Sequence, residues 1–137
     1  MREILFRGKR ADNGEWVEGS LFHDPDLEQY LIFGFDYYYN GVTGLERDEF
    51  CYHIIPSTVG QYTGFKDKNG KKIFDGHIIR NLKTKETAVV QWFPEHSAFM
   101  VWCKSSNEVG FLYECTKSNI EVIGNIHDNP ELLKQEG

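Results

Sequence analysis

Residues 56–80 decide the fold, and they read PSTVGQYTGFKDKNGKKIFDGHIIR. The Asn69-Gly70 pair in this stretch favours the positive φ angles that a tight hairpin turn needs. Apolar, aromatic and β-branched residues flank the turn, as is typical of strands. A second reversal at Asp75-Gly76 leads into another strand that starts with His77. The stretch therefore predicts short strands that are joined by two tight turns.

The rest of the chain repeats this pattern of short apolar segments between turn residues. Eight to ten short strands are expected, and Asn129-Pro130-Glu131 predicts the start of a single short helix. Residues 111–115 are expected to form a half-exposed strand. Without helical crossover segments a parallel sheet is excluded, so the fold class is mainly β and antiparallel.

Two β units follow from this reading. Residues 59–137 are predicted to form an SH3-like barrel or roll with a short C-terminal helix. Residues 1–58 are predicted to form an additional N-terminal β unit, and the two units are expected to pack as one body. Its 137 residues let the chain bury roughly two-thirds of its unfolded surface, so no metal, disulfide or cofactor is needed for folding, and no cofactor is predicted.

Charge and cysteine content narrow the classes of function. The 21 acidic and 15 basic residues give a net charge of −6, which repels nucleic acid at long range. Three widely spaced cysteines are typical of reduced thiols in a cytosolic protein. No apolar run approaches the roughly 20 residues of a membrane span, and no signal-peptide core follows the start. We therefore expect a cytoplasmic protein that has no membrane partner.

Three blocks of the chain resemble a known family. They are REILFRGKRADNGEWVEGSL at residues 2–21, VGQYTGFKDKNGKKIFDGHII at 59–79 and EVIGNIHDNPELL at 121–133. In this order they resemble the blocks of the YopX-like proteins of bacteriophages and prophages. The resemblance implies a β-rich fold with an SH3-like barrel, a phage or prophage origin and a life in the bacterial cytoplasm. It carries over no catalytic residues, and it marks His77 as a departure, because the family commonly has Asp there.

Aromatic residues suggest a protein-binding surface. The candidate residues are Trp16, Phe35, Tyr37, Tyr38 and Tyr39. Aromatic side chains are enriched where protein interfaces are strongest. The competing interpretation is that these rings are buried between the two β units. On the first interpretation the protein is a non-catalytic interaction module whose partner is a host or phage protein, or a second copy of the chain.

A basic hairpin supports an alternative function, nucleic-acid binding by a small β-barrel. The candidate residues are Tyr62, Lys66, Lys68, Lys71 and Lys72. Lysines can contact phosphates while a ring stacks on a base. The competing interpretation is that the lysines solvate an exposed hairpin and protect its edge. The negative net charge disfavours nucleic acid as the partner.

Metal binding and catalysis have weaker support in the sequence. Cys51 and His53 are two residues apart on one strand face, but zinc sites normally show two such closely spaced pairs. A nucleophilic thiol would come from Cys103 or Cys115, with His96 or His127 as its base, and no local motif supports this arrangement. We therefore predict neither a metal site nor a catalytic site. In the enzyme interpretation, His77 and His96 are the residues to mutate first.

Overall fold

The protein is mainly β and antiparallel, as the sequence predicts. The structure is a computed structural model that describes residues 2–134, and the chain divides into two compact units between Gln61 and Tyr62. Every strand pair in the described part is antiparallel, the sheets are open and the helices are few and short. Within residues 2–134 no helix has the length and apolarity needed to cross a bilayer.

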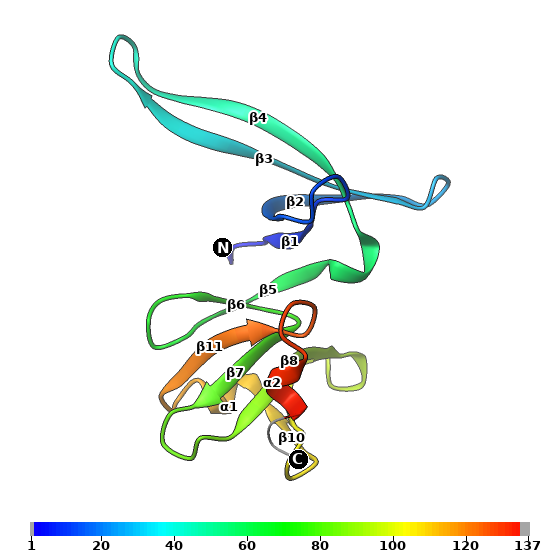
Figure 1. Cartoon of the computed structure of the whole chain (residues 1–137), viewed down its shortest axis with the longest axis vertical. Coiled ribbons are helices and arrows are strands. Elements are labelled where there is room, and N and C mark those ends of the chain that lie inside the picture. The colour runs from blue at the N-terminus through cyan, green and yellow to red at the C-terminus, as the bar shows by residue number, and fades with distance from the viewer. Residues whose placement is uncertain (1, 135–137) are drawn as a thin grey trace. The chain divides into compact units, whose positions relative to one another are not determined.

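Unit 1 is built from hairpins in chain order (Figure 1). Its elements are β1 (Phe6–Lys9), β2 (Trp16–Asp24), β3 (Gln29–Asn40), β4 (Gly44–Ile54) and the 3-10 turn η1 (Pro56–Thr58). The sheet order is β4-β3-β2-β1, and the start of β5 (Gly60–Lys66) pairs with β1 through Phe6 and Gln61. Strands that are adjacent in this sheet are thus also consecutive in the sequence, except for the pair β1 and β5.

The end of β4 is tied back to the turn that follows β1. Arg10 and Ile54 form an isolated bridge, and the Ile55 amide donates to the Lys9 carbonyl at 2.9 Å. Ile54 is almost fully buried here. Gly8 is required for this approach, because a Cβ at this position would lie only 2.4 Å from Cγ2 of Ile54.

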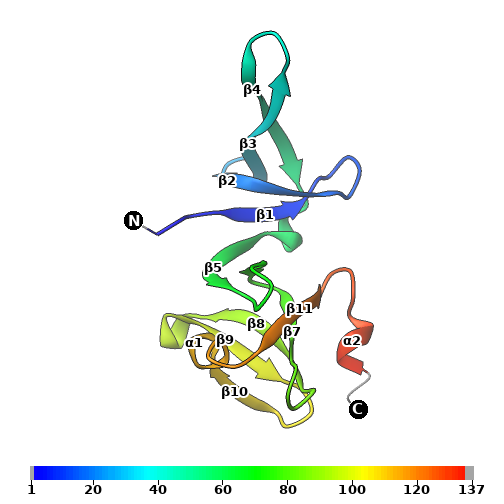
Figure 2. The ribbon, with the colours of Figure 1, turned by 90° about the vertical axis from the view of Figure 1, so that its left-hand side faces the viewer.

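Unit 2 contains the remaining strands and both α-helices. Its elements are β5, β6 (Lys72–Phe74), β7 (His77–Asn81), β8 (Thr87–Phe93), η2 (Pro94–His96), β9 (Ala98–Cys103), β10 (Glu108–Phe111), α1 (Leu112–Cys115), β11 (Ile120–Asn125) and α2 (Glu131–Lys134). Five of the strands form a sheet in the order β10-β9-β8-β7-β11 (Figure 2). The short helix α2 lies where the sequence predicts it.

One hydrophobic core cluster of unit 2 lies on one face of this sheet. Its buried members are Ile73, Ile79, Val90, Val101, Leu112, Ile120 and Val122. Asp67 connects the turn after β5 to this core, since its carboxylate accepts a hydrogen bond from the buried amide of Val122 at 3.0 Å. The chain turns at Asn69-Gly70 as predicted, but of this pair only Gly70 has a positive φ, which is 82°.

One predicted strand is wrong. Residues 111–115 do not continue as a strand, because β10 ends at Phe111 and α1 begins at Leu112. Leu112 is fully buried in the core, whereas Glu114 is exposed. In a strand these two side chains would share a face, so an extended backbone would bury the carboxylate together with the leucine. The helical turn separates them.

Candidate protein-interaction site

A two-stranded arm extends from unit 1. Strand β2 pairs with β3 only as far as Ser20 and Phe33, whereas β3 and β4 continue to pair from Gly34 and Phe50 to Asn40 and Gly44. Figures 1 and 2 both show the 41–43 turn at the far end of this hairpin. We call residues 34–50 the arm. Among the described residues, no third strand pairs with it.

One face of the arm is lined with aromatic side chains. Because side chains alternate along a strand, Phe35, Tyr37 and Tyr39 share a face, and this row continues the ring of Phe33. The ring centroids of Phe33 and Phe35 are 5.3 Å apart, and those of Phe35 and Tyr37 are 6.4 Å apart. We call this surface the aromatic face.

The aromatic face is most exposed near the tip of the arm. Tyr37 is 62% exposed, Tyr39 is 79% exposed and Leu45, which lies opposite Tyr39, is 71% exposed. Phe35 is half-buried because the guanidinium of Arg47 lies 4.2 Å from its ring centroid. The arm thus presents large apolar side chains to solvent on a ribbon that a two-stranded pairing stabilises only marginally.

The opposite face of the arm is acidic. Asp36 lies directly opposite Asp48, and Tyr38 lies opposite Glu46. The hydroxyl of Tyr38 donates to Oε2 of Glu46 at 3.2 Å, and the hydroxyl of Thr43 also contacts Glu46. The hydrogen bond to Glu46 raises the pKa of Tyr38, and the charge of Asp48 adds to this effect. We call this surface the acidic face.

Trp16 occupies a different place in unit 1. It is half-buried, and the guanidinium of Arg7 lies 3.9 Å from its ring centroid. Trp16 and Phe35 both line a depression of 520 Å³, together with Phe50 and Tyr52. The predicted protein-binding residues therefore divide into this depression and the exposed arm, and Phe35 belongs to both.

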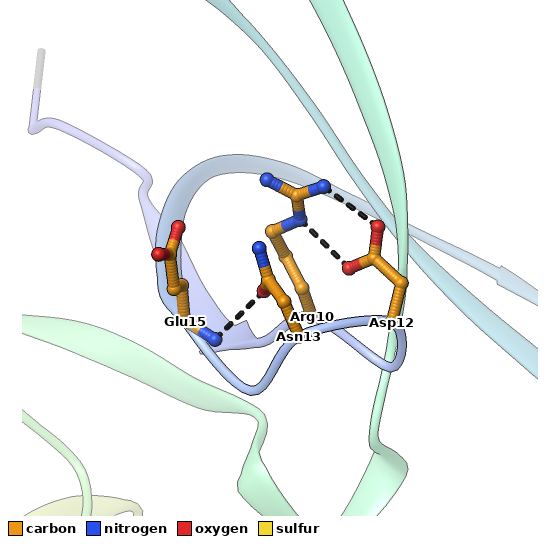
Figure 3. A network of polar contacts seen from close by, with 4 residues as sticks. All are labelled: Arg10, Asp12, Asn13 and Glu15. Atoms are coloured by element: carbon orange, nitrogen blue, oxygen red, sulfur yellow. Dashed lines mark hydrogen bonds and ion pairs between the residues drawn. The ribbon is translucent and has the colours of Figure 1, made fainter.

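Arg10 also lines the depression and is held by a polar network (Figure 3). Its Nε and Nη2 atoms donate to the two carboxylate oxygens of Asp12 at 2.9 and 2.7 Å, and its guanidinium lies 3.7 Å from the ring centroid of Tyr52. The hydrogen bond to Asp12 raises the pKa of Arg10 and lowers that of Asp12. The side chain of Asn13 fixes the same turn by accepting from the Glu15 amide at 2.9 Å. The edge of the depression is thus ordered.

In the basic hairpin three lysines are exposed, whereas the ring of Tyr62 is buried. Lys66, Lys68 and Lys71 are exposed, and the ammonium of Lys72 lies 5.4 Å from the ring centroid of Tyr62. Tyr62 is only 7% exposed and packs against Phe74. Its ring therefore has no free face for a base, and the nucleic-acid alternative loses its stacking residue.

His77 has a structural role in the tight turn at Asp75-Gly76. It is buried, and its Nδ1 atom accepts a hydrogen bond from the Phe74 amide at 2.9 Å. An aspartate carboxylate can accept the same bond, so the departure from Asp preserves an acceptor at this turn. His96 instead packs against the rings of Phe93 and Phe111.

Among residues 2–134 no cysteine belongs to a group of side chains that could hold a metal ion. Within residues 2–134 no group of three His, Cys, Asp or Glu side chains is placed to hold a metal ion. Cys103 and Cys115 both line a depression of 220 Å³ in unit 2. Burial opposes ionisation of Cys103, but hydrogen bonds from Ser105 and Ser106 outweigh it and lower its pKa. Burial raises the pKa of Cys115.

Comparison with known proteins identifies the family. Residues 5–134, nearly the whole chain, match the YopX protein family. The chain belongs to the YopX family. The resemblance carried by the three sequence blocks is thereby confirmed. No curated protein matches the chain.

A solved structure is also similar to this chain. The crystal structure of protein EF1440 from Enterococcus faecalis superposes with a TM-score of 0.63 at 23% sequence identity. The match covers 97% of this chain and 99% of that one. At this level of identity the likeness concerns the fold alone.

Sequence reasoning missed the cations that lie over the rings. Arg7, Arg10 and Arg47 each cover an aromatic side chain of unit 1. The available signal was weak, because only Arg47 lies directly across a strand pair from the aromatic run, opposite Tyr37. In this YopX-family chain the three rings that these arginines cover, those of Trp16, Phe35 and Tyr52, are all half-buried.

Proposed function

We propose that this protein is a non-catalytic accessory protein of a phage or prophage that binds a protein partner through the arm in the bacterial cytoplasm. The supporting observation is the exposure of Tyr37, Tyr39 and Leu45 on a ribbon that has no third strand among the described residues. A phage origin is supported by membership of the YopX family.

The physical argument is the cost of leaving these side chains in water. Complete burial of one such side chain in an interface contributes about 1.5–3 kcal/mol. Three neighbouring anchors on one face match the usual organisation of protein interfaces, in which a few aromatic residues carry most of the binding energy. A partner that covers the aromatic face would therefore bind mainly through the arm.

Site-specific photocrosslinking tests this function. The full chain would carry benzoylphenylalanine in place of Tyr37 in the host bacterium, and the matched control would carry it in place of Leu27, which is 64% exposed in the same unit. A partner protein crosslinked from position 37 but not from 27 is the expected result. Tyr39→Ala with Leu45→Ala should remove that product. Identical products from both positions would refute the proposal.

We also propose that unit 2 is an SH3-like barrel. The support is its five-stranded antiparallel sheet, one face of which is covered by Ile73 of the β5–β6 hairpin and by Leu112. Nuclear Overhauser contacts between backbone protons of β5 or β6 and those of an outer strand, β10 or β11, would show closure. Their absence in a fully assigned spectrum would leave an open sheet and refute the barrel.

The alternative function remains nucleic-acid binding through the exposed Lys66, Lys68 and Lys71. Filter binding at low and high salt tests it, because phosphate contacts make affinity fall steeply with salt. Burial of Tyr62 weighs against it. We therefore rank it below the protein-interaction function.

A further inference from the structure

Two hairpins of this protein place like charges directly opposite each other. In the arm Asp36 lies opposite Asp48, and in the β5–β6 hairpin Lys66 lies opposite Lys72. Like charges at directly opposed positions destabilise a strand pair. The two pairs have opposite sign, so the charge of each hairpin complements that of the other.

The charges around these pairs extend the complementarity. The arm carries four carboxylates and one guanidinium, at Asp36, Glu46, Asp48, Glu49 and Arg47, which gives a net charge of −3. Residues 66–72 carry four ammonium groups and one carboxylate, which gives a net charge of +3. Two arms would repel each other, whereas an arm and a basic hairpin attract.

Apolar surface accompanies the charge on both elements. On the acidic face of the arm, which carries Asp36 and Asp48, Tyr38 is 42% exposed. Beside the basic hairpin, the ring of Phe65 lies 6.2 Å from that of Tyr113, and Tyr113 is 56% exposed. A contact between the acidic face of the arm and the basic hairpin would thus bury rings beside opposed charges, as stable interfaces do.

We propose that the partner of the arm includes a second copy of this chain, with the arm of one copy docked on the basic hairpin, residues 66–72, of the other. This inference rests on the proposed function of the arm as a protein-binding surface. It adds the identity of a partner and the surface that the arm contacts.

The size of the arm favours a reciprocal arrangement. Seven strand residues, Gly34 to Asn40, span about 20 Å. One such ribbon is too small to bury the roughly 800 Å² per partner of a standard interface. Two arms, each docked on the other copy, double the contact and close it into a symmetric dimer.

A charge-exchange experiment on the full chain tests the proposal. The arm variant is Asp36→Lys with Asp48→Lys, and the hairpin variant is Lys66→Glu with Lys68→Glu. All four side chains are exposed, so the fold should survive the changes, and circular dichroism checks this. Molar mass would be measured by light scattering and by sedimentation between about 50 mM and about 500 mM salt.

The expected result is specific to a contact between copies. Wild-type protein should dimerise at low salt, with an affinity at least about tenfold weaker at high salt. Each variant alone should be monomeric, because its arm and its hairpin then carry the same sign. An equimolar mixture of the two should form a heterodimer, in which both contacts are restored. Lys85→Glu with Lys104→Glu, two exposed positions whose replacement changes the charge of unit 2 by the same amount, should leave wild-type association intact.

Three outcomes would overturn the proposal. They are a monomeric wild-type chain at about 50 mM salt, a mixture that stays monomeric, and an oligonucleotide that binds wild type but not the hairpin variant while the protein stays monomeric. The crosslinking test of the arm is separate. A monomeric chain that still crosslinks another protein from position 37 refutes self-association only, whereas identical products from positions 37 and 27 refute the arm as a binding surface.

Discussion

Replacement of Asp67 by alanine should destabilise unit 2. Oδ1 of Asp67 accepts hydrogen bonds from the amides of Asn69 and Lys71, each at 2.9 Å, and Oδ2 accepts from the amide of Val122 at 3.0 Å. The third bond joins positions 55 residues apart. One carboxylate thus fixes the turn and attaches it to β11.

The size of the lost stability depends on whether each amide that loses its acceptor is exposed or buried. The amides of Asn69 and Lys71 lie in an exposed turn, where water can replace the carboxylate at small cost. The Val122 amide is buried, and a buried donor without an acceptor costs about 1–3 kcal/mol. We expect Asp67→Ala to lower the free energy of unfolding of unit 2 by about 3 kcal/mol in total.

Urea unfolding measures this change. In a Trp16→Phe background only Trp92 and Trp102, both in unit 2, report by fluorescence. Asp67→Asn is the matched control, because it keeps one oxygen acceptor and should lose less stability than the alanine variant. A loss below about 0.5 kcal/mol for Asp67→Ala would refute the role of the carboxylate.

The stability difference between wild type and Asp67→Ala should also depend on pH. Burial raises the pKa of Asp67, but the hydrogen bonds from Val122, Lys71 and Asn69 outweigh it, so the folded pKa lies below the ordinary 3.8. The stability from the ionised carboxylate is therefore present above pH 3.8 and is lost as the pH falls through the folded pKa. The difference between wild type and Asp67→Ala should shrink over that range, and a constant difference would contradict the linkage.

Three further changes have defined outcomes. Gly19→Ala would place its Cβ 2.3 Å from the carbonyl oxygen of Phe33, so it should destabilise unit 1 by more than about 2 kcal/mol in urea unfolding followed at a probe in that unit. Burial raises the folded pKa of Asp75, so Asp75→Asn should raise the denaturation midpoint at neutral pH. This gain should disappear as the pH falls through the raised folded pKa to 3.8, where the wild-type carboxyl is also neutral. A thiol reagent should alkylate Cys103 before Cys115 near neutral pH, as mass spectrometry of digests would show, because their pKa values are shifted in opposite directions.

Local sequence signals predicted most of the strands because strand and turn preferences act over a few residues. The turn at Asn69-Gly70, the absence of long helices from residues 2–134 and the helix at Glu131–Lys134 all follow from neighbouring residue types. The division of the chain at 58 and 59, and the packing of two units as one body, stay predictions. Leu112 was misassigned because its core partners lie on other strands, which the local pattern does not include.

The exposure of each aromatic side chain depended on the tertiary structure. Tyr62 and Tyr37 both belong to aromatic stretches near polar residues, yet one is 7% exposed and the other 62%. Burial is set by what lies against a strand: Phe74 packs on Tyr62, whereas β3 at Tyr37 has already passed the end of its pairing with β2. The sequence by itself determined turns, strands and family, because these depend on local preferences and on matched motifs. Only the tertiary structure decided which rings and charges face water, because that depends on contacts between residues far apart in the chain.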